Sequence, residues 1–171
     1  MYQEAMTATT TPLADTADQL DNSDVDWLSE REMAAWLAYI ETQGDLMTAL
    51  ENDLGPTDLT LGDYQVFVYL SNADDHSMRM CDLATMLQLS PSGLTRRLDG
   101  LVNAGWVERR NSRADRRVML AVLTHAGHRK LEQAALPHLA SVRRHIIDLL
   151  DPTELDAMAR IFGKIRDALD A

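Results

Sequence analysis

The stretch from Ser90 to Arg117 gathers side chains that bind phosphate groups and nucleic-acid bases. It contains seven arginines and three acids, whereas the whole chain has a formal net charge of −11. Arginine forms paired hydrogen bonds with phosphate and with guanine, so an arginine-rich surface can bind nucleic acid. Such a segment can also be no more than a solvated face. The pattern of the surrounding residues therefore has to decide between these two interpretations.

Charge is distributed unevenly along the chain. Residues 1–75 contain sixteen acids and one base, Arg31, whereas residues 76–171 contain eleven acids and fifteen bases. At physiological salt the Debye length is about 8 Å, so a basic surface remote from the acidic segment is only weakly cancelled by it. The acidic net charge therefore does not exclude an anionic partner.

Composition limits the class of protein. With 171 residues and 46% hydrophobic content, the chain can form one domain with a tail. We expect a cytoplasmic protein without a membrane partner, because no secretion signal and no apolar run of about 18 residues is present. A single cysteine, Cys81, excludes an intramolecular disulfide, and no zinc-binding pattern occurs. No cofactor and no structural metal are expected.

The first part of the chain divides into a tail and a long helix. Residues 1–24 are rich in Thr, Ala and Asp, which predicts a disordered acidic tail. Ser29 and Glu32 have the spacing of a capping box, although the helix could begin earlier, at Asp24 or Asp26. Apolar residues then follow at helical spacing: Met33, Trp36, Leu37, Ile40, Met47, Leu50 and Leu54. They form one apolar face.

A helix-turn-helix pattern lies in the middle of the chain. Gly55 and Pro56 end the first helix, and Thr60 can cap a second one. A loop over residues 71–77 precedes a short third helix that carries apolar residues from Met80 to Leu87. A fourth helix follows almost at once, with Ser90 as its cap, Pro91 in its first turn and Gly105 at its end. Two short helices joined by a tight turn are typical of this motif.

In the last third of the chain, the periodicity of the apolar residues changes from that of a helix to that of a strand and back again. The runs "WVERR" and "RRVMLAVLT" favour strands, and "NSRAD" between them favours a turn, so we expect a hairpin. A helical pattern runs from Thr124 to Leu150, and Pro137 should bend it. Asp151, Pro152 and Glu154 then predict the start of a last helix that reaches about Leu169.

The fourth helix has two chemically different faces. Its inward face is apolar and comprises Leu94, Leu98, Leu101 and Val102. Its outward face is small and polar and comprises Ser92, Thr95, Arg96, Asp99 and Asn103. Short hydrogen-bonding side chains near a helix N-terminus suit the DNA major groove, and the arginines of the hairpin could contact backbone phosphates or a minor groove.

The run from Leu83 to Gly127 resembles the DNA-binding core of the MarR family of bacterial regulators. The shared elements are S-x-x-T-R, L-x-x-x-G, D-R-R and L-T-x-x-G, in that order. The resemblance implies a mainly α (α+β) fold, with a winged helix-turn-helix domain and a helical dimerisation region. The implied division is a tail over 1–24, a dimerisation helix over 25–56, a winged helix-turn-helix domain over 57–124 and C-terminal dimerisation helices over 125–171. It also implies a homodimer that binds double-stranded DNA.

The site residues follow from the helix pattern and the resemblance together. Expected DNA contacts are Ser90, Ser92, Thr95, Arg96, Arg97, Arg109, Arg110, Arg113, Arg116 and Arg117. Asp115 should instead pair with an arginine and hold the wing in shape, because phosphate repels a carboxylate. Gly93, in the first turn of the fourth helix, is a departure from the family pattern. Glycine there lowers helix stability by up to about 1 kcal/mol relative to alanine.

Some residues allow a sensing role. The resemblance implies a small aromatic or anionic effector, for which Trp36, Tyr39 and Tyr64 are candidate contacts, although aromatic residues at helical spacing also suit a core. His125 and His128 could share a metal, but no further ligand is clearly placed, and we expect no metal site. Cys81 could respond to oxidation, yet the peroxide-sensing relatives carry their cysteine near the start of the first helix, where this chain has none.

The function expected is a DNA-binding transcriptional repressor on an inverted-repeat operator, released by a small molecule. One alternative is a redox-responsive or metal-responsive member of the same family. Another is a winged-helix adaptor that binds only proteins. An enzyme is not expected, because the sequence offers no nucleophile with its base, no catalytic carboxylate pair and no phosphate-binding glycine loop.

Overall fold

The computed structural model describes residues 26–169 of the chain. These residues divide into two compact units within the first helix, one ending at Tyr39 and the other beginning at Ile40. The expected tail, residues 1–24, lies outside the described residues. The winged helix-turn-helix elements and the C-terminal helices all belong to the second unit.

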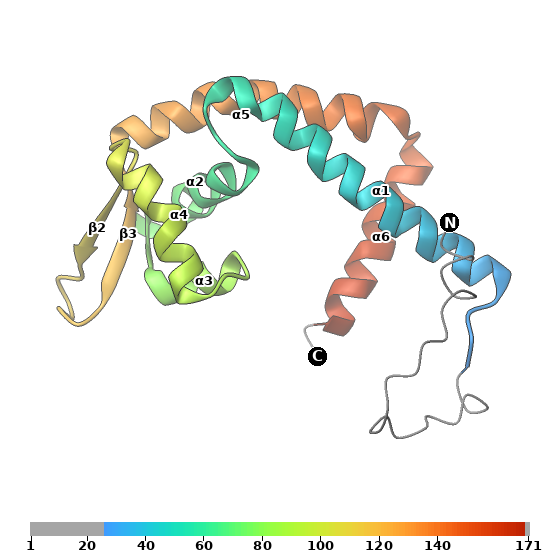
Figure 1. The fold of residues 1–171 in the computed structure, drawn as a ribbon, viewed down its shortest axis with the longest axis horizontal. Helices are drawn as coiled ribbons and strands as arrows, with labels where there is room; N and C mark the ends of the chain where they lie inside the picture. Colours follow the sequence, from blue (N-terminus) through green and yellow to red (C-terminus); the bar gives the residue numbers. More distant parts are fainter. Residues whose placement is uncertain (1–25, 170–171) are drawn as a thin grey trace, which may run out of the picture. The chain divides into compact units, whose positions relative to one another are not determined.

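Six α-helices and three strands are found in the described residues (Figure 1). The helices are α1 (Glu30–Leu54), α2 (Leu61–Asn72), α3 (Met80–Met86), α4 (Pro91–Asn103), α5 (His125–His145) and α6 (Pro152–Leu169). The strands are β1 (Ser77–Arg79), β2 (Val107–Asn111) and β3 (Met119–Leu123). Short 3-10 turns are η2 (Gly55–Thr57), η3 (Asp74–His76) and η4 (Ile147–Leu149). The mainly helical winged-helix fold predicted from the sequence is confirmed.

Local capping chemistry sets the helix starts where the sequence predicts them. The Glu32 carboxylate accepts hydrogen bonds from the backbone N–H and the hydroxyl of Ser29, at 2.8 and 2.6 Å. At α2, Thr60 and Asp63 form a complete capping box. At α6, Asp151 caps the helix, and its backbone N–H donates to the carboxylate of Glu154 at 2.9 Å. These caps satisfy N–H groups that have no partner within a helix.

A third strand, β1, completes the sheet and was not predicted. The order is β1-β3-β2, with both pairs antiparallel. Ser77 pairs with Val122 and Arg79 with Leu120. A three-residue strand has too few positions to show alternation in the sequence, and its partner lies more than forty residues along the chain. Ser77, the last residue of the loop expected over residues 71–77, is therefore the first residue of a strand.

Helix α5 ends earlier than the sequence pattern predicted. It passes through Pro137 and stops at His145, so Ile146, Leu149 and Leu150 lie outside it. The last turn carries Arg143, Arg144 and His145, and positive side chains favour a helix C-terminus. Side chains also fix this end: Arg144 and His145 both bind the carboxylate of Asp53 in α1, and Arg143 binds Asp148 in η4.

The core of the second unit lies between α2, α3, α4, the sheet and the first half of α5. Fully buried side chains from these elements include Phe67, Leu70, Leu83, Leu98 and Val107, and α5 contributes Ala134. The rings of Phe67 and Trp106 meet edge to face, with centroids 6.1 Å apart. Helix α4 and the β2–β3 hairpin both pack on this core.

Candidate nucleic-acid interface

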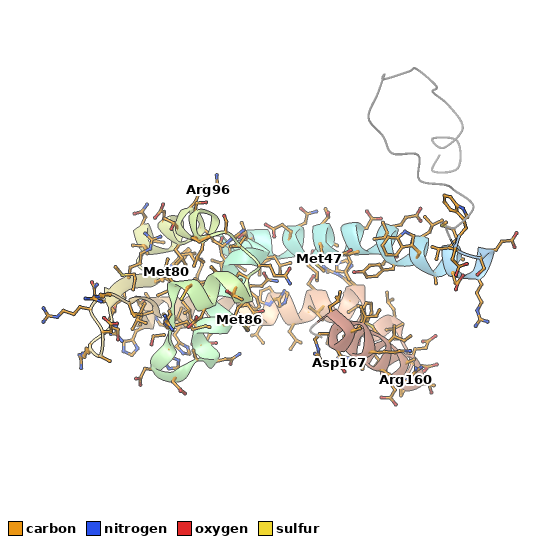
Figure 2. The ribbon with its side chains drawn as sticks, turned by 90° about the horizontal axis from the view of Figure 1, so that it is seen from below. Met47, Met80, Met86, Arg96, Arg160 and Asp167 are labelled. Atoms are coloured by element: carbon orange, nitrogen blue, oxygen red, sulfur yellow. The ribbon has the colours of Figure 1, made fainter. Side chains whose placement is uncertain are left out.

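Helix α4 presents the outward face that the sequence predicts. The hydroxyl of Ser90 accepts the backbone N–H of Gly93 at 3.1 Å, and Pro91 occupies the first turn. Gly105, with a φ of 74°, ends the segment in the left-handed conformation that glycine favours. Leu94, Leu98 and Leu101 are buried on the inward face. Ser92, Thr95 and Arg96 are exposed on the other face, and the Arg96 side chain points away from the unit (Figure 2).

The wing is a short, internally bonded loop between β2 and β3. The side-chain amide of Asn111 donates to the carbonyl of Arg116 at 2.6 Å, and the backbone N–H of Arg117 donates to Asp115 at 2.9 Å. Asp115 was expected to pair with an arginine side chain, whereas this contact is with the backbone of Arg117. Arg113, Arg116 and Arg117 are exposed in this loop.

Three of the predicted DNA contacts have acidic or hydroxyl partners within the chain. Arg97 of α4 reaches Thr60 and Asp63 of α2, at 3.2 and 3.4 Å. Arg109 of β2 donates to Asp99 at 2.8 Å and to the carbonyl of Thr95 at 2.7 Å. Arg110 lies 3.6 Å from Glu108, and both side chains are about half exposed.

Arg109 also joins strand β2 to helix α4, a connection that sequence patterns do not reveal. Its side chain is mostly buried, and its Nε has no hydrogen-bond partner within the described part of the chain. Because both Nη groups bind α4, the β2 strand holds Thr95 and Asp99 in place. We therefore distinguish paired arginines from the exposed arginines at the wing tip.

Hydrogen bonds also join the start of α5 to the residues that precede β2. The hydroxyl of Thr124 donates to the carbonyl of Gly105 at 2.8 Å, and its backbone N–H donates to the carbonyl of Trp106 at 3.0 Å. A Cβ atom at Gly127 would come within 2.1 Å of the same Trp106 oxygen, so the backbones approach as closely as only glycine allows. Lys130 lies over the Trp106 ring, 4.7 Å from its centroid.

A separate pocket of about 340 Å³ lies between α1, α2 and α5 in the second unit. Its lining comprises Met47, Leu50, Leu61, Tyr64, Gln65, Val68, Tyr69, His138 and Val142. The rings of Tyr64 and His138 are 4.4 Å apart. Burial lowers the pKa of His138 and raises the pKa of Tyr64, so both side chains are neutral near pH 7. The Nδ1 atom of His138 is buried and has no hydrogen-bond partner among the described residues.

The three aromatic residues named as effector contacts are placed differently. Tyr64 lines the pocket, whereas Trp36 and Tyr39 are exposed residues of the first unit, with ring centroids 6.1 Å apart. His138 was not predicted as a site residue, because a lone histidine on an amphipathic helix has no distinguishing sequence pattern. Its ring contact with Tyr64 spans more than seventy residues of sequence.

The other candidate sensing residues are not gathered into one site. Cys81 is exposed, and its Sγ lies 3.3 Å from a carboxylate oxygen of Asp82. His128 packs against His76, with ring centroids 4.8 Å apart, while His125 is exposed. Within residues 26–169, no three or more His, Cys, Asp and Glu side chains are arranged to hold a metal ion. The helices of that same range include none long and apolar enough to cross a membrane.

Comparisons with known proteins agree on one family. A family model described as MarR family matches residues 57–118. The crystal structure of AbsC, a MarR family transcriptional regulator from Streptomyces coelicolor, shares 40% identity and has a TM-score of 0.81, covering 85% of this chain and 99% of AbsC. Sco3205, a MarR family transcriptional regulator from the same organism, was crystallised in complex with DNA. Sco3205 is 27% identical to this chain, and the two structures align with a TM-score of 0.81. The alignment covers 88% of this chain and 94% of Sco3205.

A curated relative gives the same result over a shorter length. The transcriptional repressor MprA of Escherichia coli K12 is 32% identical over 107 residues, which are 63% of this chain and 60% of MprA. The match thus spans less than two thirds of that relative. All three of these proteins are transcriptional regulators by description. With AbsC matched over nearly its full length and the family model matched across the helix-turn-helix core, the chain belongs to the MarR family.

Proposed function

We propose that this protein is a sequence-specific, DNA-binding transcriptional regulator, and specifically a repressor, rather than an enzyme. The observation that carries the proposal is the joint exposure of Thr95 and Arg96 on α4 with Arg113, Arg116 and Arg117 on the wing. A helix face for a major groove beside a cationic loop for the phosphate backbone or a minor groove is the arrangement that reads duplex DNA. The related Sco3205 was crystallised with DNA, and MprA is described as a repressor.

The proposed contacts divide by chemistry. Ser92, Thr95 and Arg96 would read base edges in the major groove, and Arg110, Arg113, Arg116 and Arg117 would contact phosphate or a minor groove. Ser90 would help through the α4 N-terminus that it caps, because the first N–H groups of a helix favour an anion. Asp115 would keep the wing in shape. Since the bacterial chromosome lies in the cytoplasm, the protein would act there.

We further propose a homodimer formed by residues 25–56 and 125–171. In α6 no residue is buried, and Ile161, Phe162 and Ile165 are each more than 40% exposed. Met33, Ile40 and Met47 are similarly exposed on α1. An apolar surface of this extent marks an interface, and a two-fold axis would present one winged domain of residues 57–124 to each half of an inverted repeat.

The DNA-binding proposal is tested by selecting duplexes from a randomised library with the full-length protein. We expect an enriched inverted repeat with half-sites about 34 to 36 Å apart, and an affinity that falls steeply between about 50 and 200 mM salt. Binding to neither the enriched pool nor random duplex at low salt would contradict the proposal and favour a winged-helix adaptor that binds proteins.

We propose that the pocket around Tyr64 and His138 binds a small aromatic or anionic effector that releases the DNA. Support comes from Nδ1 of His138, which has no hydrogen-bond partner among the described residues, in a lining that also offers the polar groups of Tyr64, Gln65 and Tyr69 among apolar side chains. Calorimetric titration of benzoate and similar aromatic carboxylates, with and without the selected duplex, tests this. Reciprocal linkage requires the duplex to weaken ligand binding by the factor with which the ligand weakens DNA binding. A His138→Phe variant keeps an aromatic ring at this position and removes both imidazole nitrogens; unchanged ligand binding by it would exclude this pocket.

A further inference from the structure

Two neighbouring arginines of α4 occupy different surroundings. Arg96 is exposed, and no ion pair or hydrogen bond to its side chain is found among residues 26–169. The side chain of Arg97 is about two thirds buried and turns toward the first residues of α2. Adjacent residues on a helix differ by about 100° in direction, so the two side chains leave α4 toward different surroundings. The question is which chemistry Arg97 serves.

The guanidinium of Arg97 lies in a place that only glycine leaves open. A Cβ atom at Gly62 would come 2.2 Å from Nη1, 2.5 Å from Cζ and 2.8 Å from Nη2 of Arg97. All three nearest atoms to that position belong to one planar group. The guanidinium therefore lies against the backbone of α2 at Gly62, in the space that a side chain would occupy in any other residue.

The cap of α2 supplies acceptors for the same guanidinium. Asp63 uses Oδ2 for the backbone N–H and the hydroxyl of Thr60, at 3.1 and 2.6 Å, and leaves Oδ1 for Arg97. The hydroxyl oxygen of Thr60 accepts from the backbone N–H of Asp63 at 3.1 Å and from Nη1 of Arg97 at 3.2 Å. Each group thus uses its hydrogen-bonding capacity without conflict.

We propose that Arg97 is a positioning residue that fixes the DNA-binding helix α4 to α2 and does not neutralise a DNA phosphate. This inference rests on the proposed DNA-binding function. The hollow beside it, lined by Thr60, Asp63, Leu89, Gly93, Arg96 and Arg97, contains the Asp63 carboxylate, which repels a phosphate. Thr60, Gly62, Asp63 and Arg97 together are named the α2 clamp here. Its effect is to set the orientation in which Thr95 and Arg96 meet the bases.

Three substitutions separate the clamp from a phosphate contact. Arg97→Ala removes the charge and the clamp. Arg97→Lys keeps the charge but loses the planar group that fits Gly62 and reaches two acceptors. Gly62→Ala keeps Arg97 and displaces its flexible end from α2, without substituting any residue of α4. Gly100→Ala is the matched control, because it lies outside the proposed dimerisation segments, is not one of the proposed DNA contacts, and a Cβ atom there meets no atom within 4 Å.

Affinity is measured by fluorescence anisotropy, across a salt series, for the duplex that the wild-type protein selects and for a random duplex of equal length. We expect each of the three variants to bind the selected duplex about tenfold more weakly, the loss expected from one charged hydrogen bond. Random-duplex affinity and the salt slope should not change. Gly62→Ala combined with Arg97→Ala should be no weaker than either alone, because both remove one interaction.

Different results would overturn the proposal. If Arg97 contacts phosphate, Arg97→Ala lowers the salt slope by about 0.9 and weakens both duplexes equally, while Arg97→Lys stays near wild type. Unchanged binding by Gly62→Ala would also exclude the clamp.

Thermal unfolding tests the clamp without any DNA. The drop in Tm caused by Arg97→Ala should be smaller when Gly62→Ala is already present than in the wild-type background, because the clamp is already broken there. Equal drops in both backgrounds would contradict the clamp even if the protein binds no duplex. If the drop in Tm is smaller in the Gly62→Ala background but the protein binds no duplex, the result would count against the proposed function and not against the clamp.

Discussion

Helices α4 and α6 carry apolar residues at similar helical spacing, yet they use them differently. Leu94, Leu98 and Leu101 of α4 are at most 3% exposed, because α2, α3 and the sheet surround them. In α6, Ile161 and Ile165 are 46% and 50% exposed. The same pattern in a sequence can therefore specify an intramolecular core or an exposed apolar face of the kind that marks an interface. What distinguishes the two is the presence of elements that pack on the face, and that is decided far along the chain.

The largest effect should come from the α4 side of this comparison. Leu98 is fully buried, so Leu98→Ala removes packing and leaves a cavity, and we expect a loss of about 2 to 5 kcal/mol in the free energy of unfolding. Urea titration at fixed protein concentration measures it. The exposed Met86 on α3, in the same domain as Leu98, offers a control, and for Met86→Ala a much smaller loss is expected. Equal losses in both variants would show that Leu98 is not a core residue.

A smaller effect on folding, but a large one on assembly, should come from the α6 side. Ile165→Glu places a charge on the proposed interface, which cannot be buried without a partner, so the dimer should dissociate while the protomer keeps its helical content. Sedimentation velocity with circular dichroism checks this at micromolar concentration. Asp156→Asn in the same helix changes an exposed side chain and should leave the dimer intact. A wild-type chain that sediments as a folded monomer would remove the explanation of the exposed α6 face.

The exposed face of α4 and the wing tip should be separable by specificity. Thr95→Val should make the free energy of binding less favourable by about 1 to 3 kcal/mol for the selected duplex and by little for random DNA. The reason is that a base contact contributes this energy only when the correct base lies opposite it. Arg116→Ala should weaken both duplexes and lower the salt slope by about 0.9 for one lost phosphate contact. Competition titrations with both duplexes at several salt concentrations provide the comparison. If both variants weaken specific and random DNA equally, the proposed division between reading and positioning is wrong.

Helix starts and the hairpin could be predicted because their causes lie within a few residues. The caps at Ser29, Thr60, Ser90 and Asp151 each use a partner three residues away. The end of α5 could not be predicted, because the partner of Arg144 and His145 is Asp53, about ninety residues earlier. Periodicity alone extended the helix to Leu150.

The candidate site shows the same limit. Composition identifies the arginines of α4 and the wing, but it cannot show which of them already have partners. Arg97 meets Asp63 across 34 residues, and Arg109 meets the Thr95 carbonyl across 14. Gly62 and Gly127 give no sequence signal for their roles, since a close approach depends on the atoms opposite them. Strand β1 is similarly defined only by its pairing with β3.

The smallest expected effect concerns the contact between α1 and the end of α5, the helix that precedes α6 in the chain. The carboxylate of Asp53 accepts hydrogen bonds from Ser141 at 2.6 Å, from Arg144, and from His145 at 2.8 Å. These bonds, with that from Ser141 the largest cause, lower the pKa of Asp53 from 3.8 to about 2. A carboxylate with a lowered pKa in the folded state stabilises the fold fully above the unfolded value and loses this contribution as the pH falls toward the folded value.

Asp53→Asn should therefore reduce stability at pH 6, and its deficit relative to wild type should shrink as the pH falls from about 4 to about 2. Urea midpoints of both proteins across this range, at one protein concentration, give the difference directly. Asp45→Asn on the same helix is the control, because no hydrogen bond or ion pair to Asp45 is found among residues 26–169. Its difference from wild type should be small and should not change with pH. A deficit of Asp53→Asn that stays constant down to pH 2 would mean that the side chain acts there through its shape, and that its charge does not hold the end of α5.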